Sequence, residues 1–570
     1  MKPRKGPFKT LIGHFVRRLF APEEQQAPEG MSFGLGGVLA ILASPGAFAS
    51  IFLMNKYSTF LQWLRGVYYN PIQRSPSDEY FFIVLSMTII GLVMVTRWNR
   101  LFPDRRDFSN LAVLPIPIRN IFLANFVALL GLAVLFGIDV NVVSALLFPF
   151  FVTLSLNSFP AMIHVGVAHA VTVFLSSLFS FFAVFALVGA LMLMVPRRIF
   201  RGVSVLMRML LVVVLLTEFF SNIFVQLFSG RLPGGAGNSL HWLPSYWFLG
   251  VYESIVGIAK PPMVALAHQA LLGLAVAVIV STGAYALCYR RLFIRLPESF
   301  DTMGGSRPFF KIRFPEFLLA PLFRSQFERG CSSFSLKVLL RSEQHLLFIG
   351  AYLGVGLVIV AQSALDNLST ASGTALPSSE YLAIPLLIAF FMLSGLRFVF
   401  DRPATLDANW LFRYAANSPE PHPRSIAKRL MLWATLPWEI AILFPLSAAR
   451  LGWSSGLLHA AAVVALTVLL SDTLLVFFRK IPFTCAAQLD IKQLLIQMLA
   501  TIFGVLIIVP GIAGIEHWML YQPLRFIWLA MALSAGWFWL ARYRRDADAQ
   551  NPRMIFQDGP GPAFELLKLT

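Results

Sequence analysis

The residues of this chain that could do chemistry are ionisable side chains inside long apolar segments. Charges are rare inside membrane helices and often mark a substrate path or a proton relay. Glu218 in VVLLTEFFSN and Glu439 in LPWEIAILF lie deepest within the apolar segments. We therefore take both as candidates for an intramembrane path. The alternative is a structural role, through a bound proton, a water-filled cleft or a neighbouring hydroxyl. Further ionisable residues within or beside apolar segments are Asp139, His268, Asp472 and Glu516.

No pattern for catalysis or for a bound cofactor accompanies these acids. The sequence contains no Gly-x-x-x-x-Gly-Lys-Ser/Thr, so we expect no ATPase in this chain. His164, His169 and His268 lack the spacing to carboxylates that a metal centre or a haem needs, and we expect polar contacts between helices instead. The three cysteines also lack a metal-ligand spacing. The chain is therefore not expected to be an enzyme or to bind a cofactor itself.

The composition predicts the elements that must position these residues. A hydrophobic fraction of 57%, a charged fraction of 13% and a mean hydropathy of +0.71 lie outside the soluble range. The alternating segments of a β-barrel are not found. We expect an all-α, polytopic helical membrane protein with about twelve spans. The predicted spans are 34–55, 80–96, 120–138, 168–195, 208–228, 264–287, 346–364, 380–396, 430–448, 454–478, 493–512 and 523–541.

One apolar run, 140–156, is ambiguous. Counting it as a crossing would invert every later segment, so we take it as re-entrant or as part of a bent neighbouring helix. Most of the 46 Lys and Arg residues then fall on the side that holds both termini. The positive-inside rule makes this side the cytosol, so the predicted topology is N-in and C-in, in the cell inner (cytoplasmic) membrane. This topology accounts for most of the excess positive charge, a net charge of +18. No nucleic-acid partner is therefore expected.

This topology divides the spans into two parallel, pseudo-symmetric halves of six helices each. The N-terminal segment carries apolar residues at helical spacing and is predicted to lie as an amphipathic helix on the inner membrane surface. The predicted domains are an N-terminal segment 1–33, a first transmembrane half 34–287, a cytosolic connector 288–345, a second transmembrane half 346–541 and a cytosolic tail 542–570.

Each half carries a charged insert after its second span. Burying the charged residues of the first insert, 97–119, would cost roughly 20 kcal/mol at about 3 kcal/mol each, so the insert must lie outside the hydrocarbon. Its pattern predicts a short amphipathic helix that is capped at its start and ended by prolines. The residues expected on this helix and at its ends are Asp104, Arg105, Arg106, Asp107, Phe108, Leu111, Leu114 and Pro115.

The second insert, 397–429, predicts a similar helix. Asp401 and Arg402 precede it, Pro403 suits its first turn, and Leu406 and Trp410 lie on its apolar side. Two such helices could contact a two-fold symmetric cytosolic partner, or both could lie on lipid headgroups.

The segment DFSNLAVLPIPIRNIFLANFVAL resembles the ABC-2-type permeases of ABC transporters. In that family a leucine-rich helix, a Leu-Pro bend and a basic residue precede the third span, and the helix couples the permease to an ATPase subunit. The corresponding elements here are Leu111, Leu114, Pro115, Ile116 and Arg119. HWLPSYWFLGVYESIVG is similar to the Pro-x-x-Trp-Phe segment of the same family. The second insert lacks a Leu-Pro bend.

The resemblance implies a full-length permease, an exporter with two fused six-span halves, that uses ATP through a separate ABC ATPase subunit, expected in two copies. The main alternative is an ion-gradient-driven secondary transporter with a buried carboxylate site at Glu218 or Glu439. A membrane enzyme is the third possibility, and the absence of a clustered catalytic constellation argues against it.

Overall fold

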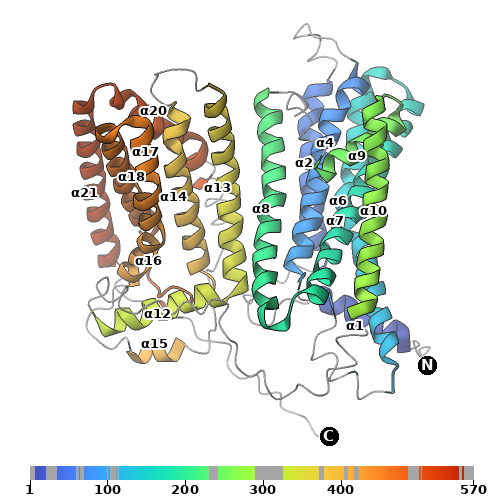
Figure 1. Ribbon diagram of the computed structural model, residues 1–570, viewed down its shortest axis with the longest axis horizontal. Coiled ribbons are helices and arrows are strands. Elements are labelled where there is room, and N and C mark those ends of the chain that lie inside the picture. Colours follow the sequence, from blue (N-terminus) through green and yellow to red (C-terminus); the bar gives the residue numbers. More distant parts are fainter. Residues whose placement is uncertain are drawn as a thin grey trace. The chain divides into compact units, whose positions relative to one another are not determined.

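The structure is a computed structural model whose described residues are helical with short connections. They are 7–20, 35–58, 63, 70–98, 101–102, 111, 115–229, 242–288, 325–370, 378–403, 409–415, 423–485, 500–501, 503–550 and 555–556. No β-strand occurs among them, and ten helices there are long and apolar enough to cross a membrane. The chain is therefore an all-α, multi-pass, membrane-embedded protein (Figure 1).

Two predicted spans are not among these ten helices. The span at 34–55 falls in α2 (Leu35–Tyr57), in which only Leu42–Met54 forms a shorter apolar helix. The span at 493–512 lies partly outside the described residues, and its end forms η9 (Gly504–Ile508) and the start of α20 (Val509–Leu520). Twelve spans in two parallel halves, and the orientation in the membrane, stay predictions.

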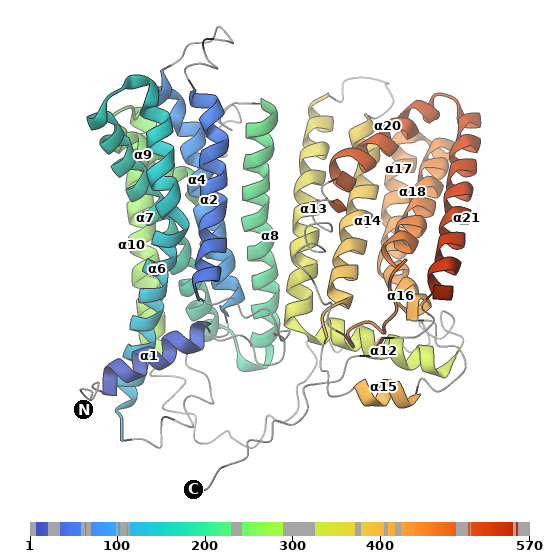
Figure 2. The ribbon, with the colours of Figure 1, turned by 180° about the vertical axis from the view of Figure 1, so that it is seen from behind.

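Residue contacts divide the chain into two compact units, Met1–Ser306 and Arg307–Thr570, and the boundary falls within the predicted connector. The first unit is a bundle of helices with α1 across one end (Figure 2). Its helices, besides α2, are α1 (Pro7–Phe20), α4 (Pro71–Thr96), α6 (Ile118–Thr153), η2 (Leu154–Leu156), α7 (Phe159–Met194), α8 (Arg197–Ser229), α9 (Pro244–Val256) and α10 (Pro261–Cys288).

Local signals explain where several of these helices begin and end. The Asn70 side chain accepts a hydrogen bond from the backbone N–H of Ile72, and Pro71 starts α4. Ser158 caps α7 in the same way, after Asn157 turns the chain with a left-handed backbone. Gly257, with φ of 83°, ends α9. Capping therefore sets the start of α4 nine residues before the predicted span.

The ambiguous run at 140–156 belongs to its neighbour. It continues α6 without a break, through Pro149, into the short helix η2. At 1.5 Å per residue the 36 residues of α6 extend about 54 Å, whereas the hydrocarbon core of a bilayer is about 30 Å thick. The run is therefore part of the neighbouring helix α6 and does not form a re-entrant segment.

The second unit is also a helical bundle. Its helices are α12 (Gln326–Arg341), α13 (Glu343–Thr370), α14 (Ser379–Phe400), α15 (Asn409–Ala415), α16 (Pro423–Trp438), η8 (Glu439–Leu443), α17 (Phe444–Leu451), α18 (Trp453–Leu474), η9, α20, η10 (Pro523–Arg525) and α21 (Phe526–Gln550). In Figures 1 and 2, α12 runs across one end of this bundle and α15 lies beside it. One apolar core lies between α14, α18 and α20, and a second lies at the end near α12.

Candidate functional site

Polar residues at the start of α4 connect most helices of the first unit. The buried Asp78 carboxylate accepts hydrogen bonds from Lys56 Nζ at 2.8 Å and from the Tyr57 hydroxyl at 2.5 Å, both on α2. The Ser75 hydroxyl lies 2.8 Å from that of Tyr252 on α9. Ser75 and Asp78 belong to the segment SPSDEY, and both lie just before the predicted span 80–96.

Glu79 heads a series of three buried side chains. Its Oε2 lies 2.6 Å from Nδ1 of His169 on α7, and His169 Nε2 lies 3.2 Å from Oγ of Ser144 on α6. The order serine, histidine, carboxylate is that of a hydrolase relay. All three side chains are nonetheless fully buried, with Phe82 and Phe148 against the imidazole. Because the serine hydroxyl is buried, we interpret the series as a structural link between α4, α6 and α7. It agrees with the expectation that His169 makes polar contacts between helices.

Glu218, the first path candidate, is held in a similar way. Its carboxylate accepts a hydrogen bond from Ser245 at the start of α9, and the Ser245 hydroxyl lies 3.1 Å from that of Tyr80. Glu218 on α8 is thus connected through α9 to α4. These contacts agree with the structural alternative, in which a neighbouring hydroxyl satisfies the acid.

The polar end of α9 lies outside the candidate spans. Burial raises the pKa of Glu253, an effect that the positive charge of Lys260 partly offsets. Burial also raises the pKa of the Tyr252 phenol well above its ordinary value, with a smaller contribution from the nearby Glu79 carboxylate. Tyr252 therefore stays a neutral hydrogen-bonding group at any physiological pH.

Glu439, the second path candidate, begins a π-helical turn in the second unit. Such turns are rare and occur often at functional sites. The side chain is only 3% exposed, and its Oε1 accepts a hydrogen bond from Thr467 on α18 at 3.0 Å. Its Oε2 has no hydrogen-bond partner among the described residues. Glu439 therefore differs from Glu218 in having an unused carboxylate oxygen.

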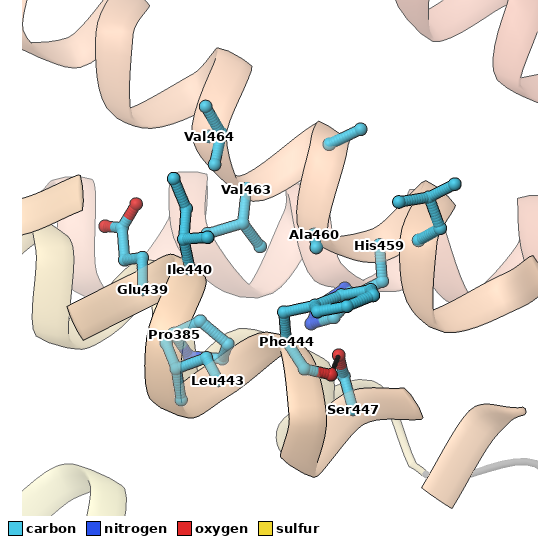
Figure 3. Close-up of a pocket in the computed structure, with 12 residues that line it drawn as sticks. Pro385, Glu439, Ile440, Leu443, Phe444, Ser447, His459, Ala460, Val463 and Val464 are labelled. Carbon is cyan, nitrogen blue, oxygen red and sulfur yellow. Dashed lines mark hydrogen bonds between the residues drawn. The ribbon is translucent and has the colours of Figure 1, made fainter. Parts of the chain in front are cut away.

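A cavity of about 300 Å³ lies beside Glu439 (Figure 3). Figure 3 shows Glu439 at one end of the lining and Ser447 and His459 toward the other. His459 Nδ1 is itself paired with Oε1 of Glu516 at 2.7 Å, and both side chains are buried. The remaining lining residues are apolar, namely Pro385, Ile440, Leu443, Phe444, Leu457, Ala460, Ala461, Val463 and Val464.

Asp472 holds three elements of the second unit together. Its buried carboxylate pairs with Lys428 on α16 at 2.8 Å and with Arg544 on α21 at 3.1 Å. The indole N–H of Trp537 donates to the same carboxylate at 2.9 Å. This acid, which sequence analysis noted, is therefore fully engaged by neighbouring side chains.

The second insert forms a surface at the end of the second unit. Asp401 pairs with Arg397 at 2.5 Å and with Lys480 at 2.8 Å. The Arg402 guanidinium lies over the Phe398 ring, and its carbonyl oxygen is 3.1 Å from Nε2 of His345. Asp401 and Arg402 thus fasten the end of α14 to neighbouring segments.

The helix α15 carries the exposed part of this surface. Asn409 donates to the Thr484 carbonyl at 2.5 Å, and Phe412 packs edge-on against Phe334 of α12 at 4.9 Å between centroids. These contacts leave Trp410 68% and Tyr414 76% exposed. Leu411, beside them, is also exposed. A short helix is present at Asn409–Ala415, and its side that carries Trp410 faces outward. Residues 404–408, where the predicted helix would begin, lie outside the described residues.

Most of the first insert lies outside the described residues, and so does Leu406 of the second. Leu111 is helical and half-buried, and Pro115 is exposed. Asp104, Arg105, Arg106, Asp107, Phe108 and Leu114 lie outside the described residues. The coupling role of the first insert stays a prediction.

Metal and thiol chemistry find no support in the described part of the chain. No group of three or more His, Cys, Asp or Glu residues could hold a metal ion there. All three cysteines are buried, and burial raises the pKa of the Cys331 thiol to about 12. Cys331 therefore stays a protonated, unreactive thiol at neutral pH.

No protein-family model, curated protein or solved structure matches this chain. The resemblance to ABC-2 permeases therefore stays a prediction that rests on the residues around Leu111 to Arg119 and on the segment from His241 to Gly257.

Glu516 and His169 were singled out from the sequence, but Asp78, Glu79 and His459 were not, and none of the partners of these residues was predicted. Asp78 and Glu79 were placed outside the second span, and the pairs Glu79–His169 and Glu516–His459 join residues far apart in sequence. The available signal was the run SPSDEY, which begins four residues after Pro71, because Asn70 and Pro71 mark a helix start.

Proposed function

We propose that this protein is the membrane-spanning subunit of an ABC exporter of the ABC-2 type, coupled to a separate ATPase subunit in the cell inner membrane. The observation that carries the proposal is the exposed face of α15, which presents Trp410, Leu411 and Tyr414. Tryptophan and tyrosine are the residues that most often dominate protein interfaces. In a multi-pass membrane protein such a face, which is held by contacts to Thr484 and to α12, is suited to receive force from a partner.

The coupling would pass from α15 into α14. The partner would press on Trp410 and Tyr414, while Asn409 and Phe412 hold α15 to the unit. Asp401, paired with Arg397 and Lys480, then transfers the displacement to the end of α14. In this scheme Asp401 is a positioning residue and Trp410 is a contact residue.

The test is recovery of an ABC-type ATPase subunit with the tagged protein from its native membranes. Trp410→Ala combined with Tyr414→Ala should lower the recovered ATPase at least about tenfold, because hot-spot residues contribute 2 kcal/mol or more. Trp242→Ala is the matched control, since Trp242 is 83% exposed but lies in the first unit. Equal recovery of the ATPase with wild type and the double variant would refute a docking role for α15.

A secondary transporter is the second candidate, favoured by the unused oxygen of the buried Glu439 beside a cavity. The two candidates differ in their energy source. Transport by proteoliposomes that contain only this chain, driven by an ion gradient without ATP, would favour the second.

A further inference from the structure

The cavity beside Glu439 has the properties of a ligand site. Its volume of about 300 Å³ matches the smaller ligand pockets of proteins, and such pockets are mostly apolar with a few placed polar groups. The lining fits this description, with apolar residues from α14, η8, α17 and α18 and three polar residues. The cavity lies wholly within the second unit.

The cavity opens on an apolar helical surface. Ile440 and Leu457, which belong to its lining, are 55% and 59% exposed on the surface of the unit. Both lie in segments that are apolar enough to span a membrane, Pro423–Leu451 and Trp453–Leu474. A ligand would therefore enter from an apolar medium, which selects for an alkyl chain.

The polar groups of the cavity specify the head of this ligand. Burying a carboxylate is costly unless a cation or a hydrogen-bond donor satisfies it. Thr467 supplies one donor to Glu439, but no cationic side chain pairs with this acid among the described residues. His459, the histidine of the lining, is already paired with Glu516. Glu79 and Glu516 also have one oxygen without a hydrogen-bond partner among the described residues, but of the three acids only Glu439 lines the cavity. A ligand in the cavity could therefore satisfy this acid with a cationic donor.

We propose that this cavity binds an alkylammonium amphiphile, with its ammonium group on Glu439 and its chain along the apolar lining. The proposal names a substrate class and in that sense rests on the proposed transport function. Binding itself needs no ATPase, so it is measured separately from ATPase recovery.

The experiment uses the full chain in phosphatidylcholine nanodiscs and a dodecylammonium probe with a diazirine in its chain. After illumination, peptide mass spectrometry locates the label. The label should concentrate on residues 437–464. Unlabelled dodecylammonium should displace it at a concentration about tenfold lower than dodecyl sulfate, because a hydrogen bond to a charged group is worth 1.5–3 kcal/mol.

Three variants make the result decisive. Glu439→Gln should weaken binding of dodecylammonium about tenfold while leaving the protein monodisperse. Leu457→Trp at the opening should reduce labelling by the dodecylammonium probe. Glu253→Gln, a buried acid on α9, is the control and should leave labelling unchanged. Label spread evenly over the exposed helices, or equal displacement from wild type and Glu439→Gln, would overturn the proposal. If Trp410→Ala combined with Tyr414→Ala lost the ATPase but kept the labelling, the result would concern the docking role of α15 and leave the cavity proposal intact.

Discussion

Buried acids link helices within both units. In the first unit Asp78, Glu79 and Glu218 each have a partner on another helix. In the second unit Asp472, Glu516 and Glu439 do as well. One oxygen each of Glu79, Glu439 and Glu516 has no hydrogen-bond partner among the described residues. An unsatisfied buried oxygen is costly. Of these three acids Glu439 is the one that lines the cavity, so it is the one available to a ligand.

The pair Glu79–His169 should be strongly coupled. Replacing either residue alone with Leu should destabilise the protein by about 3–5 kcal/mol, because the remaining partner is buried without compensation. The double replacement should cost clearly less than the sum of the single ones. The melting temperature in detergent, followed by tryptophan fluorescence, measures each variant.

The control for this cycle is Glu380→Gln, which changes an exposed acid on α14 and should leave the melting temperature unchanged. Additive effects of the two single replacements would show that Glu79 and His169 do not depend on each other.

Two glycines, Gly250 and Gly189, let neighbouring helices approach α10 closely. A Cβ added to Gly250 on α9 would collide with the carbonyl oxygen of Met263 and lie 2.9 Å from the Ala267 nitrogen on α10. A Cβ at Gly189 on α7 would lie 2.6 Å from the Ala284 Cβ on α10. The packing of α10 therefore depends on small residues, as is common between membrane helices.

Gly250→Ala should lower the stability of the protein by about 1–3 kcal/mol, because backbone atoms of α10 cannot move aside easily. Gly283→Ala is the matched control, since no atom lies within 4 Å of a Cβ at Gly283 on α10. The control should be neutral or stabilising, because alanine favours a helix by up to about 1 kcal/mol over glycine. Equal melting temperatures of the two variants would contradict the close approach of α9 and α10.

The orientation of the protein in the membrane follows from charge rather than from packing. The predicted N-in, C-in topology places α15 in the cytosol and Trp242 on the outer side. The native cysteines give a low background for labelling, because all three are buried. Introduced cysteines can therefore report the side of each segment.

A membrane-impermeant maleimide applied to intact cells should label Trp242→Cys and leave Leu411→Cys unlabelled. Both native side chains are exposed, so accessibility within the protein is matched. After the membrane is permeabilised, both variants should react. The reverse pattern would invert the topology and would remove α15 from the reach of a cytosolic ATPase.

Composition and apolar periodicity were enough to predict an all-α, multi-pass membrane protein, because a bilayer imposes length and hydropathy on each span. Helix starts at Pro71 and Phe159 also follow from local capping. The partners of Glu79, Glu516 and Asp472 could not be predicted, because each pairs with residues brought near only when the helices pack. The cavity beside Glu439 likewise needs α14, α17 and α18 together, so its existence depends on the packing of segments distant in the chain.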